Sequence, residues 1–291
     1  MTQVAVVCDS TASIPAEIIA TLNIRVVPFY IHHGEKVWRD LVDISHDQFY
    51  QLLPTLKTLP TTAYPGPGDF YQLYEKLASE GVRDIVSIHI TSKNSGTFRG
   101  AQMGGEMAAE KLEGVTVTAI DTLNVAMCHG WMVIEAARAA QAGAGVSEIA
   151  RLLEKMIPAT EMIQTADTLK YLHMGGRIGK ATHLLGSMLQ IKPLIGMRDG
   201  VIIPLGRERS RPKAYATMVD LVEKSVGSGG KIKVAYVHAA APEEAKKIRA
   251  LLEKRVTCVE SIMAELSPSL GVHSGPGTTG ICYYPASVLE G

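Results

Sequence analysis

The chain has 291 residues, 46% of them hydrophobic and 20% charged, which is enough for a large core and for two domains of about 150 residues each. Its 29 Lys and Arg residues balance 29 Asp and Glu residues, so the chain lacks the general positive charge that binds duplex nucleic acid. Only 5% of residues are aromatic, which leaves few platforms for base stacking. We therefore expect no nucleic-acid partner.

Disulfides, metal sites and membrane segments are not expected either. The four cysteines, at positions 8, 128, 258 and 282, include no C-x-x-C pair, and none of the nine histidines has H-x-x-x-H or H-E-x-x-H spacing. The N-terminus has no basic segment typical of a signal peptide, and no run of about 18 apolar residues occurs. These features predict a cytoplasmic protein with reduced thiols, no metal or other cofactor and no stable membrane insertion.

Strands and helices alternate along the first half of the chain. Short apolar runs predict strands at residues 4–7, 24–30, 84–89 and 115–120. Apolar residues at helical spacing predict helices at residues 15–22, 45–53, 68–79, 95–111, 130–141 and 146–156. This alternation indicates an N-terminal α/β domain, residues 1–157, with a largely parallel sheet covered by helices on both faces.

The second half has a different order of elements. Strands are predicted at residues 161–165, 191–197, 201–204, 231–237, 256–263 and 280–284, and helices at residues 182–189, 211–224 and 241–254. Asp199-Gly200 between two apolar runs predicts a β-hairpin. We expect a C-terminal mixed α/β domain, residues 158–291, with the boundary near Ile157-Pro158.

The segment Thr91-Ser92-Lys93-Asn94-Ser95-Gly96-Thr97 follows a predicted buried strand and opens a predicted helix. The first backbone amides of a helix have no intrahelical partner and carry the positive end of the helix dipole, so they attract anions. Ser95 can donate a hydrogen bond through its hydroxyl, and Gly96 lets a ligand approach the backbone. An ordinary serine N-cap is the alternative for this loop taken alone.

Three other loops carry polar groups that suit the same kind of ligand. Each combines glycine or proline with a hydrogen-bond donor: Thr62 within residues 60–68, Arg177 within residues 168–178, and His273 within residues 271–278. Taken alone, each is more commonly a structural turn or a structural histidine.

Together with Asp9-Ser10-Thr11, these segments resemble the DegV family. Members of that family read as a D-S-T start, a T-S-x-P-like loop, an S-G-T loop, an L-x-x-G-G-R-I stretch and a late H-x-G-P-G. The matching segments occur in the same order over essentially the whole chain, at residues 9–11, 62–65, 95–97, 172–178 and 273–277. One departure is Ala63, which stands where the second loop has serine. If that hydroxyl matters, head-group contacts there are expected to be weaker.

The resemblance implies a two-domain α/β fold of the DegV type over about residues 3–288, with a ligand in the cleft between the domains. It implies a protein that binds a long-chain fatty acid such as palmitate by its carboxylate, with Thr62 and Ser95 as hydrogen-bond donors. Supporting roles at the head group fall to Gly96, Thr97, Arg177, His273 and Ser10. No catalytic residue is implied. In related bacterial systems a separate fatty acid kinase phosphorylates the bound carboxylate, and such a kinase is the implied protein partner.

The chemistry of a fatty acid suits these residues. A buried carboxylate requires several hydrogen-bond donors, and each buried methylene of the tail contributes about 0.8 kcal/mol. The tail requires an apolar tunnel, for which the candidate segments are residues 103–107, 184–189 and 191–195. Plain core packing is the alternative for each segment.

An enzyme that acts on a small anionic substrate, either a hydrolase or a phosphotransferase, is the main alternative. Ser95 and His273 would then form a nucleophile and a base, but the chain has no G-x-S-x-G motif to expose a strained nucleophile. The nearest match to a phosphate-binding loop has Met174 where glycine is needed and Ala181 where Ser or Thr is needed.

A DNA-linked regulator is the third possibility, because Arg207, Arg209 and Arg211 form a basic run. The zero net charge argues against a duplex footprint. We expect this run to contact a protein partner or a phosphate, with a solvated surface as the alternative.

Overall fold

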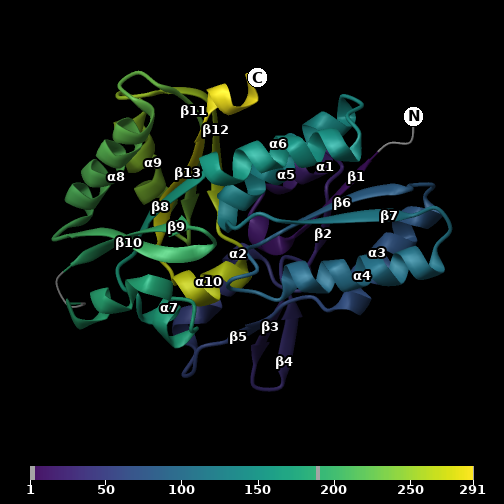
Figure 1. Ribbon diagram of the computed structural model, residues 1–291. Helices are drawn as coiled ribbons and strands as arrows, with labels where there is room; N and C mark the ends of the chain where they lie inside the picture. The colour runs from purple at the N-terminus through teal and green to yellow at the C-terminus, as the bar shows by residue number, and fades with distance from the viewer. Residues whose placement is uncertain (1–3, 188–190, 291) are drawn as a thin grey trace.

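A computed structural model describes residues 4–187 and 191–290 (Figure 1). Within this part of the chain, the first half forms a four-stranded sheet in the order β2-β1-β6-β7. All its pairings are parallel, as predicted. Its strands are β1 (Ala5–Asp9), β2 (Arg25–Val27), β6 (Asp84–His89) and β7 (Thr116–Asp121).

The second half forms a six-stranded mixed sheet in the order β10-β9-β8-β13-β11-β12. The strands are β8 (Glu161–Thr165), β9 (Lys192–Arg198), β10 (Val201–Glu208), β11 (Lys231–His238), β12 (Thr257–Glu265) and β13 (Thr279–Pro285). The predicted hairpin joins β9 to β10, and both of its turn residues, Asp199 and Gly200, have positive φ. That backbone conformation is the one that an Asp-Gly hairpin turn requires.

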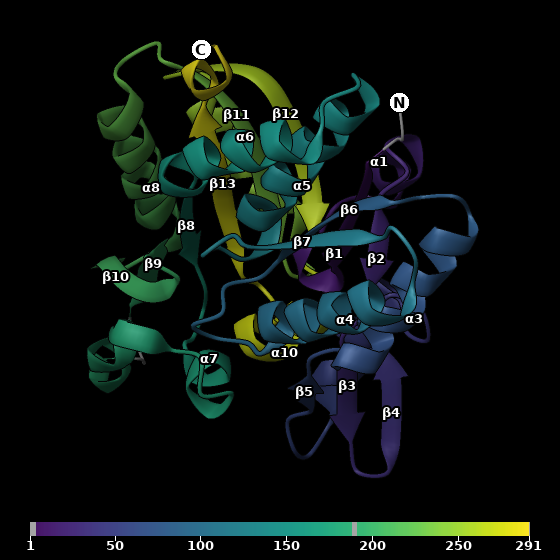
Figure 2. The ribbon, with the colours of Figure 1, turned by 45° about the vertical axis from the view of Figure 1, so that its right-hand side comes forward.

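Helices separate and cover the two sheets (Figures 1 and 2). Helices α5 and α6 lie between the sheets, α3 and α4 cover the other face of the four-stranded sheet, and α8 and α9 cover the outer face of the six-stranded sheet. The described helices are α1 (Ala16–Thr21), α2 (His46–Leu52), α3 (Pro67–Ser79), α4 (Thr97–Lys111), α5 (Ala126–Gln141), α6 (Val146–Ala159), α7 (Lys170–Met174), α8 (Arg211–Val226), α9 (Pro242–Leu252) and α10 (Pro268–Ser274). Short 3-10 segments are η1 (Ser10–Ala12), η2 (Leu53–Thr55), η3 (Gly179–Ser187) and η4 (Ala286–Leu289).

The central helix α5 joins the two sheets through one hydrophobic core. Ile88 of β6, Trp131 of α5 and Tyr284 of β13 belong to the same cluster of buried side chains. The Trp131 ring meets the Tyr284 ring edge to face at 5.7 Å, and Trp131 Nε1 donates to the carbonyl of Cys282 at 3.2 Å. A helix that is apolar on nearly all sides is stable only when it is buried on all sides.

A third, small sheet was not predicted. Its order is β4-β3-β5, and its strands are β3 (Tyr30–His33), β4 (Lys36–Arg39) and β5 (Thr61–Ala63). The prediction of one strand over residues 24–30 is wrong at its end, because β2 stops at Val27 and β3 begins at Tyr30. Pro28 lies between them, has no backbone N–H and cannot continue a hydrogen-bonded ladder.

Other predicted boundaries differ in smaller ways. Helix α4 begins at Thr97 rather than at residue 95, and α6 continues past the expected domain boundary to Ala159. The helix predicted at residues 182–189 is a 3-10 segment up to Ser187, and the rest of it lies outside the described residues. None of the described helices is long and apolar enough to cross a membrane.

Candidate ligand-binding site

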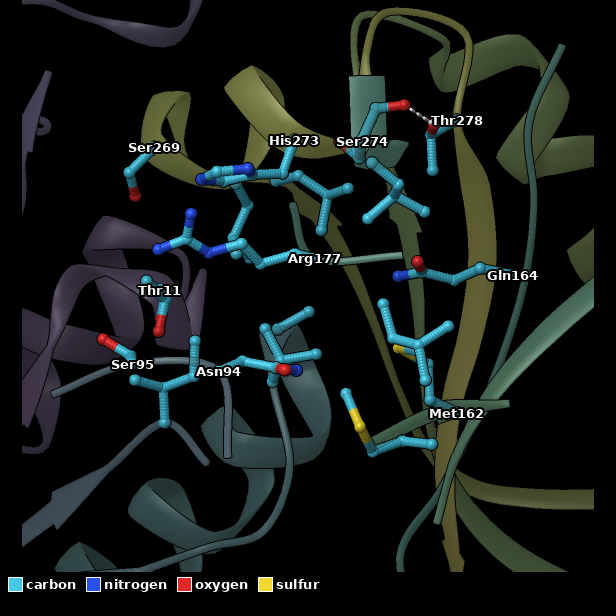
Figure 3. Close-up of a pocket in the computed structure, with 18 of the residues that line it drawn as sticks. Thr11, Asn94, Ser95, Met162, Gln164, Arg177, Ser269, His273, Ser274 and Thr278 are labelled. Atoms are coloured by element: carbon cyan, nitrogen blue, oxygen red, sulfur yellow. Dashed lines mark hydrogen bonds between the residues drawn. The ribbon is translucent and has the colours of Figure 1, made fainter. Parts of the chain in front are cut away.

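A pocket of about 930 Å³, counting the part that is open to solvent, lies between the two sheets (Figure 3). Its walls come from η1, β5, the loop before α4, β8, the turn after α7, β9 and α10. Strands and loops from both halves of the chain therefore build one site.

Two predicted site residues, Thr62 and His273, meet at the wall of the pocket. Thr62 lies on β5 and His273 on α10, and Thr62 Oγ1 is 2.8 Å from His273 Nε2. The glycine pair of the L-x-x-G-G-R-I stretch makes this position possible, because a Cβ at Gly175 would overlap Nδ1 of His273. The structure thus brings together two motifs that are 211 residues apart.

His273 is neutral at physiological pH. Burial, with a smaller contribution from the charge of Arg177, lowers the pKa of His273 to about 4. Its Nδ1 atom is buried and has no hydrogen-bond partner within the described residues. A neutral ring that donates from Nε2 to Thr62 leaves the Thr62 hydroxyl free to donate to an anion.

Ser95 lies on the pocket wall, in the loop that leads into α4. Its Oγ is 2.7 Å from Thr97 Oγ1 and accepts from the Thr97 amide at 3.4 Å. Gly96 and Thr97 are not among the residues that line the pocket. Gly96 gives space to Tyr64, because a Cβ at position 96 would overlap the Tyr64 ring. These two residues therefore shape the loop that presents Ser95.

Ser10 lies behind the pocket wall, and its neighbour Thr11 lines the pocket instead. The Ser10 hydroxyl donates to Asp40 Oδ2 at 2.7 Å and accepts from the Phe29 amide at 3.1 Å. Asp40 also accepts from the hydroxyl of Ser269, which does line the pocket. Burial raises the pKa of the Asp40 carboxyl, and the hydrogen bonds from Ser269 and Ser10 partly oppose that rise.

Arg177 is the only charged side chain among the described residues that line the pocket. It is exposed, and its Nη1 donates to the carbonyl of Gly175 at 2.7 Å. In the view of Figure 3, Arg177, His273, Ser95 and Thr11 gather on one side of the pocket, and Gln164 and Met162 lie on the other. One side of the pocket is thus rich in hydrogen-bond donors.

The other walls are largely apolar. They include Ile195 of β9, as expected for the segment 191–195, together with Met162 and Met197. The segment 103–107 does not line the pocket, because α4 packs its glycines against Phe70 and Val117 on the far side of the four-stranded sheet. For the segment 184–189, Leu184 is buried in the cluster that contains Ile195, and residues 188–189 lie outside the described part.

Several lining residues are not among those predicted to contact the head group, and Thr11, Asn94 and Gln164 are three of them. Thr11 belongs to the D-S-T motif, and Asn94 precedes Ser95, so each stood next to a predicted residue. Asn94 Nδ2 and Thr91 Oγ1 both donate to the carbonyl of Gly200, at 3.4 and 3.1 Å, which ties the loop to the β9–β10 turn. Gln164 is a polar residue on a strand that is otherwise mostly buried. A polar residue in such a strand is the only feature of the sequence that could have indicated a site residue here.

The features that suggested an enzyme are not assembled as a catalytic site. Within the described residues, no hydrogen bond joins Ser95 to His273, since Ser95 pairs with Thr97 and His273 with Thr62. The segment that approaches a phosphate-binding loop runs from α7 into a 3-10 segment, whereas that loop needs a strand before it and a helix after it.

The basic run of Arg207, Arg209 and Arg211 is only partly available to contact a partner. Arg211 pairs with Asp167 at 2.7 Å and donates to the carbonyl of Gly277 at 2.8 Å. It therefore holds the end of β8 against the loop before β13, while Arg207 and Arg209 remain exposed.

Fold and pocket define a class of two-sheet α/β proteins in which hydroxyl and imidazole donors face an apolar wall. The chain belongs to the DegV family: the family profile described as "Uncharacterised protein, DegV family" matches residues 3–286. A DegV domain-containing protein of Halalkalibacterium halodurans is 32% identical over 284 residues, which is 98% of this chain and 99% of that protein. The resemblance seen in the five motifs is confirmed.

Solved structures show the same fold. A DegV family protein from Thermus thermophilus, described by its fatty acid binding, is 28% identical with a TM-score of 0.90, over 98% of this chain and all of that one (100%). DegV of Bacillus subtilis, described as a fatty acid binding protein, is 30% identical with a TM-score of 0.87, over 98% and 100% of the two chains.

Proposed function

We propose that this chain binds a long-chain fatty acid, with the carboxylate at Thr62 and Ser95 and the acyl chain along the apolar walls. The observation that carries the proposal is one pocket in which a donor-rich side faces an apolar side. The family relatives from T. thermophilus and B. subtilis, described as fatty acid binders, support it.

The head group receives several donors. The Thr62 hydroxyl is free to donate when His273 donates to it, and the Ser95 hydroxyl lies on the pocket wall just before α4. Arg177 adds the positive charge, and Ser10 supports the wall from behind through Asp40. Together these groups offset the cost of removing a carboxylate from water.

The proposal makes the chain a carrier rather than an enzyme. A nucleophile needs a base that a third group orients, but His273 Nδ1 has no partner in the described part of the chain. In this proposal a separate fatty acid kinase phosphorylates the bound carboxylate. The isolated chain with ATP should then form no acyl phosphate, and turnover by the purified chain would instead establish the enzyme alternative.

Native mass spectrometry of protein purified from bacteria tests the proposal directly. The expected result is an added mass equal to that of a C16 to C18 fatty acid. A protein that is free of ligand and also fails to bind added palmitate contradicts the proposal.

Paired variants test the head-group site. Thr62→Val and Ser95→Ala each remove one hydrogen bond to a charged group, which typically contributes roughly 1.5–3 kcal/mol, so each should weaken palmitate binding about 10- to 150-fold. Thr61→Val and Ser92→Ala are matched controls, because Thr61 and Ser92 are exposed and do not line the pocket. Equal affinities for site and control variants, measured by titration calorimetry, would place the carboxylate elsewhere.

A further inference from the structure

Gln164 is a buried polar side chain in the apolar part of the pocket. It lies on β8, lines the pocket and is only 7% exposed. Its side-chain amide makes no hydrogen bond within the described residues, although the amide has two donor hydrogens and an acceptor oxygen. Figure 3 shows the amide end of Gln164 pointing away from β8 into the cavity.

The neighbouring strands leave room for the Gln164 side chain. In the six-stranded sheet, Gln164 is paired with Ile195 of β9 on one side and with Gly280 of β13 on the other. A Cβ at Gly280 would lie 2.5 Å from Gln164 Cγ, so any larger residue there would displace the Gln164 side chain. Met162, two residues earlier on the same face of β8, also lines the pocket. The sheet therefore directs one amide into the pocket, on a side that combines apolar side chains with Ser274 and Thr278.

The amide of Gln164 opens onto the pocket, where it is accessible to water in the absence of a ligand. A ligand that displaces this water should offer the amide a hydrogen bond, because an amide left unpaired against an apolar chain is unfavourable. In the proposed function the carboxylate has its donors at Thr62 and Ser95, and Figure 3 shows Ser95 on the opposite side of the pocket from Gln164. The Gln164 amide thus suits a neutral hydrogen-bonding group elsewhere on the ligand.

We propose that Gln164 recognises a hydroxyl or oxo group on the acyl chain, so that the pocket prefers a mid-chain oxygenated fatty acid to an unsubstituted one. The inference rests on the proposed fatty acid function and adds the substrate class to it. A hydroxyl can both donate to the amide oxygen and accept from the amide nitrogen, whereas an oxo group only accepts.

The test compares stearate with a series of C18 acids that carry one hydroxyl, or one oxo group, at different carbons. We expect one positional isomer to bind the wild-type protein about tenfold more tightly than the other isomers, which is the effect of one well-formed hydrogen bond of roughly 1.4 kcal/mol. Gln164→Met has a similar shape and no amide, so it should bind all the positional isomers with equal affinity. Gln51→Met, at an exposed position on α2, is the matched control.

Three results would overturn the inference. If the wild-type protein binds all isomers with equal affinity, or binds all of them more weakly than stearate, it lacks the recognition site. This measurement uses the wild-type protein alone, so it does not depend on whether the Gln164→Met variant folds. A Gln164→Met protein that keeps the isomer preference shows that another group recognises the oxygen. A Gln164→Met protein that loses stearate binding as strongly as Ser95→Ala shows that Gln164 contacts the carboxylate. Failure to bind any acid, stearate included, overturns the proposed function as well.

Discussion

The imidazole of His273 illustrates how single residues in this site depend on their neighbours. It lies on α10, bonds Thr62 of β5, and rests against Gly175 of the turn after α7. Burial and the nearby charge of Arg177 keep it neutral, because both disfavour the imidazolium form. The histidine therefore acts as a fixed hydrogen-bonding group at neutral pH.

The first residue-scale prediction concerns ligand-linked protonation. The pKa of His273 is about 4 in the ligand-free chain, and a bound carboxylate should raise it, because an adjacent anion stabilises the imidazolium. NMR titration of the His273 ring with and without palmitate measures this change. The Arg177→Gln variant should also raise the pKa, by removing a neighbouring positive charge. A pKa that does not respond to palmitate would separate His273 from the head group.

A second residue-scale prediction concerns stability. The folded-state pKa of about 4 lies below the unfolded value of roughly 6.5, so the unfolded chain binds this proton more readily. Neutral His273 makes its full contribution to the free energy of unfolding above about pH 6.5. This contribution, at most about 3 kcal/mol, is lost as the pH falls toward 4. Urea unfolding at pH 7.5 and pH 5 should show a smaller loss for His273→Gln than for wild type. Equal losses would contradict the prediction.

Short elements decide the shape of the pocket. The long helices and the hairpin at Asp199-Gly200 follow from periodicity and turn chemistry. The elements α7, α10 and β5 are only five, seven and three residues long, too short to show a period, and they carry or position Arg177, His273 and Thr62. The head-group side thus rests on elements that sequence patterns do not reveal.

The element-scale prediction compares the two adjacent glycines after α7. Gly175 has φ −77°, so Gly175→Ala costs little in the backbone but pushes His273 out of place, and palmitate affinity should fall about tenfold. Gly176 has φ 69° and open space around its Cβ position, so Gly176→Ala should cost roughly 1 kcal/mol of stability and leave binding nearly unchanged. Thermal melts and palmitate titration of both variants measure the two effects. Equal affinities would show that His273 tolerates the methyl group.

On the scale of the whole molecule, α5 makes the two sheets interdependent. Arg138 of α5 bonds Glu260 of β12 at 2.6 and 2.9 Å, and Lys233 of β11 bonds Glu135 of α5 at 2.8 Å. These ion pairs lie at the edge of the shared core around Trp131. We propose that the two units expected at residues 1–157 and 158–291 fold as one cooperative body.

Removing Trp131 tests that proposal. Trp131→Ala should lower the free energy of unfolding by about 3–5 kcal/mol, as for other buried large aromatic residues, and should destabilise both sheets. Hydrogen exchange of amides in β6 and β11 measures the two sheets separately. A variant in which only one sheet loses protection would show that the halves unfold independently. Phe98→Ala, on the partly exposed start of α4, is a control with a smaller expected loss.

The α/β class, the parallel N-terminal sheet, the mixed α/β second half and the DegV motifs that contain Thr62, Ser95, Arg177 and His273 are all predictable from the sequence. They are predictable because periodicity and turn chemistry are local properties of the chain. Three features follow from the packing of the two halves: Thr62 bonds His273, Thr11 rather than Ser10 lines the pocket, and Gln164 points into it. These contacts join strands and helices that are distant in sequence. The burial that lowers the pKa of His273, and the pocket into which Gln164 points with no partner among the described residues, exist only once both sheets have packed around α5.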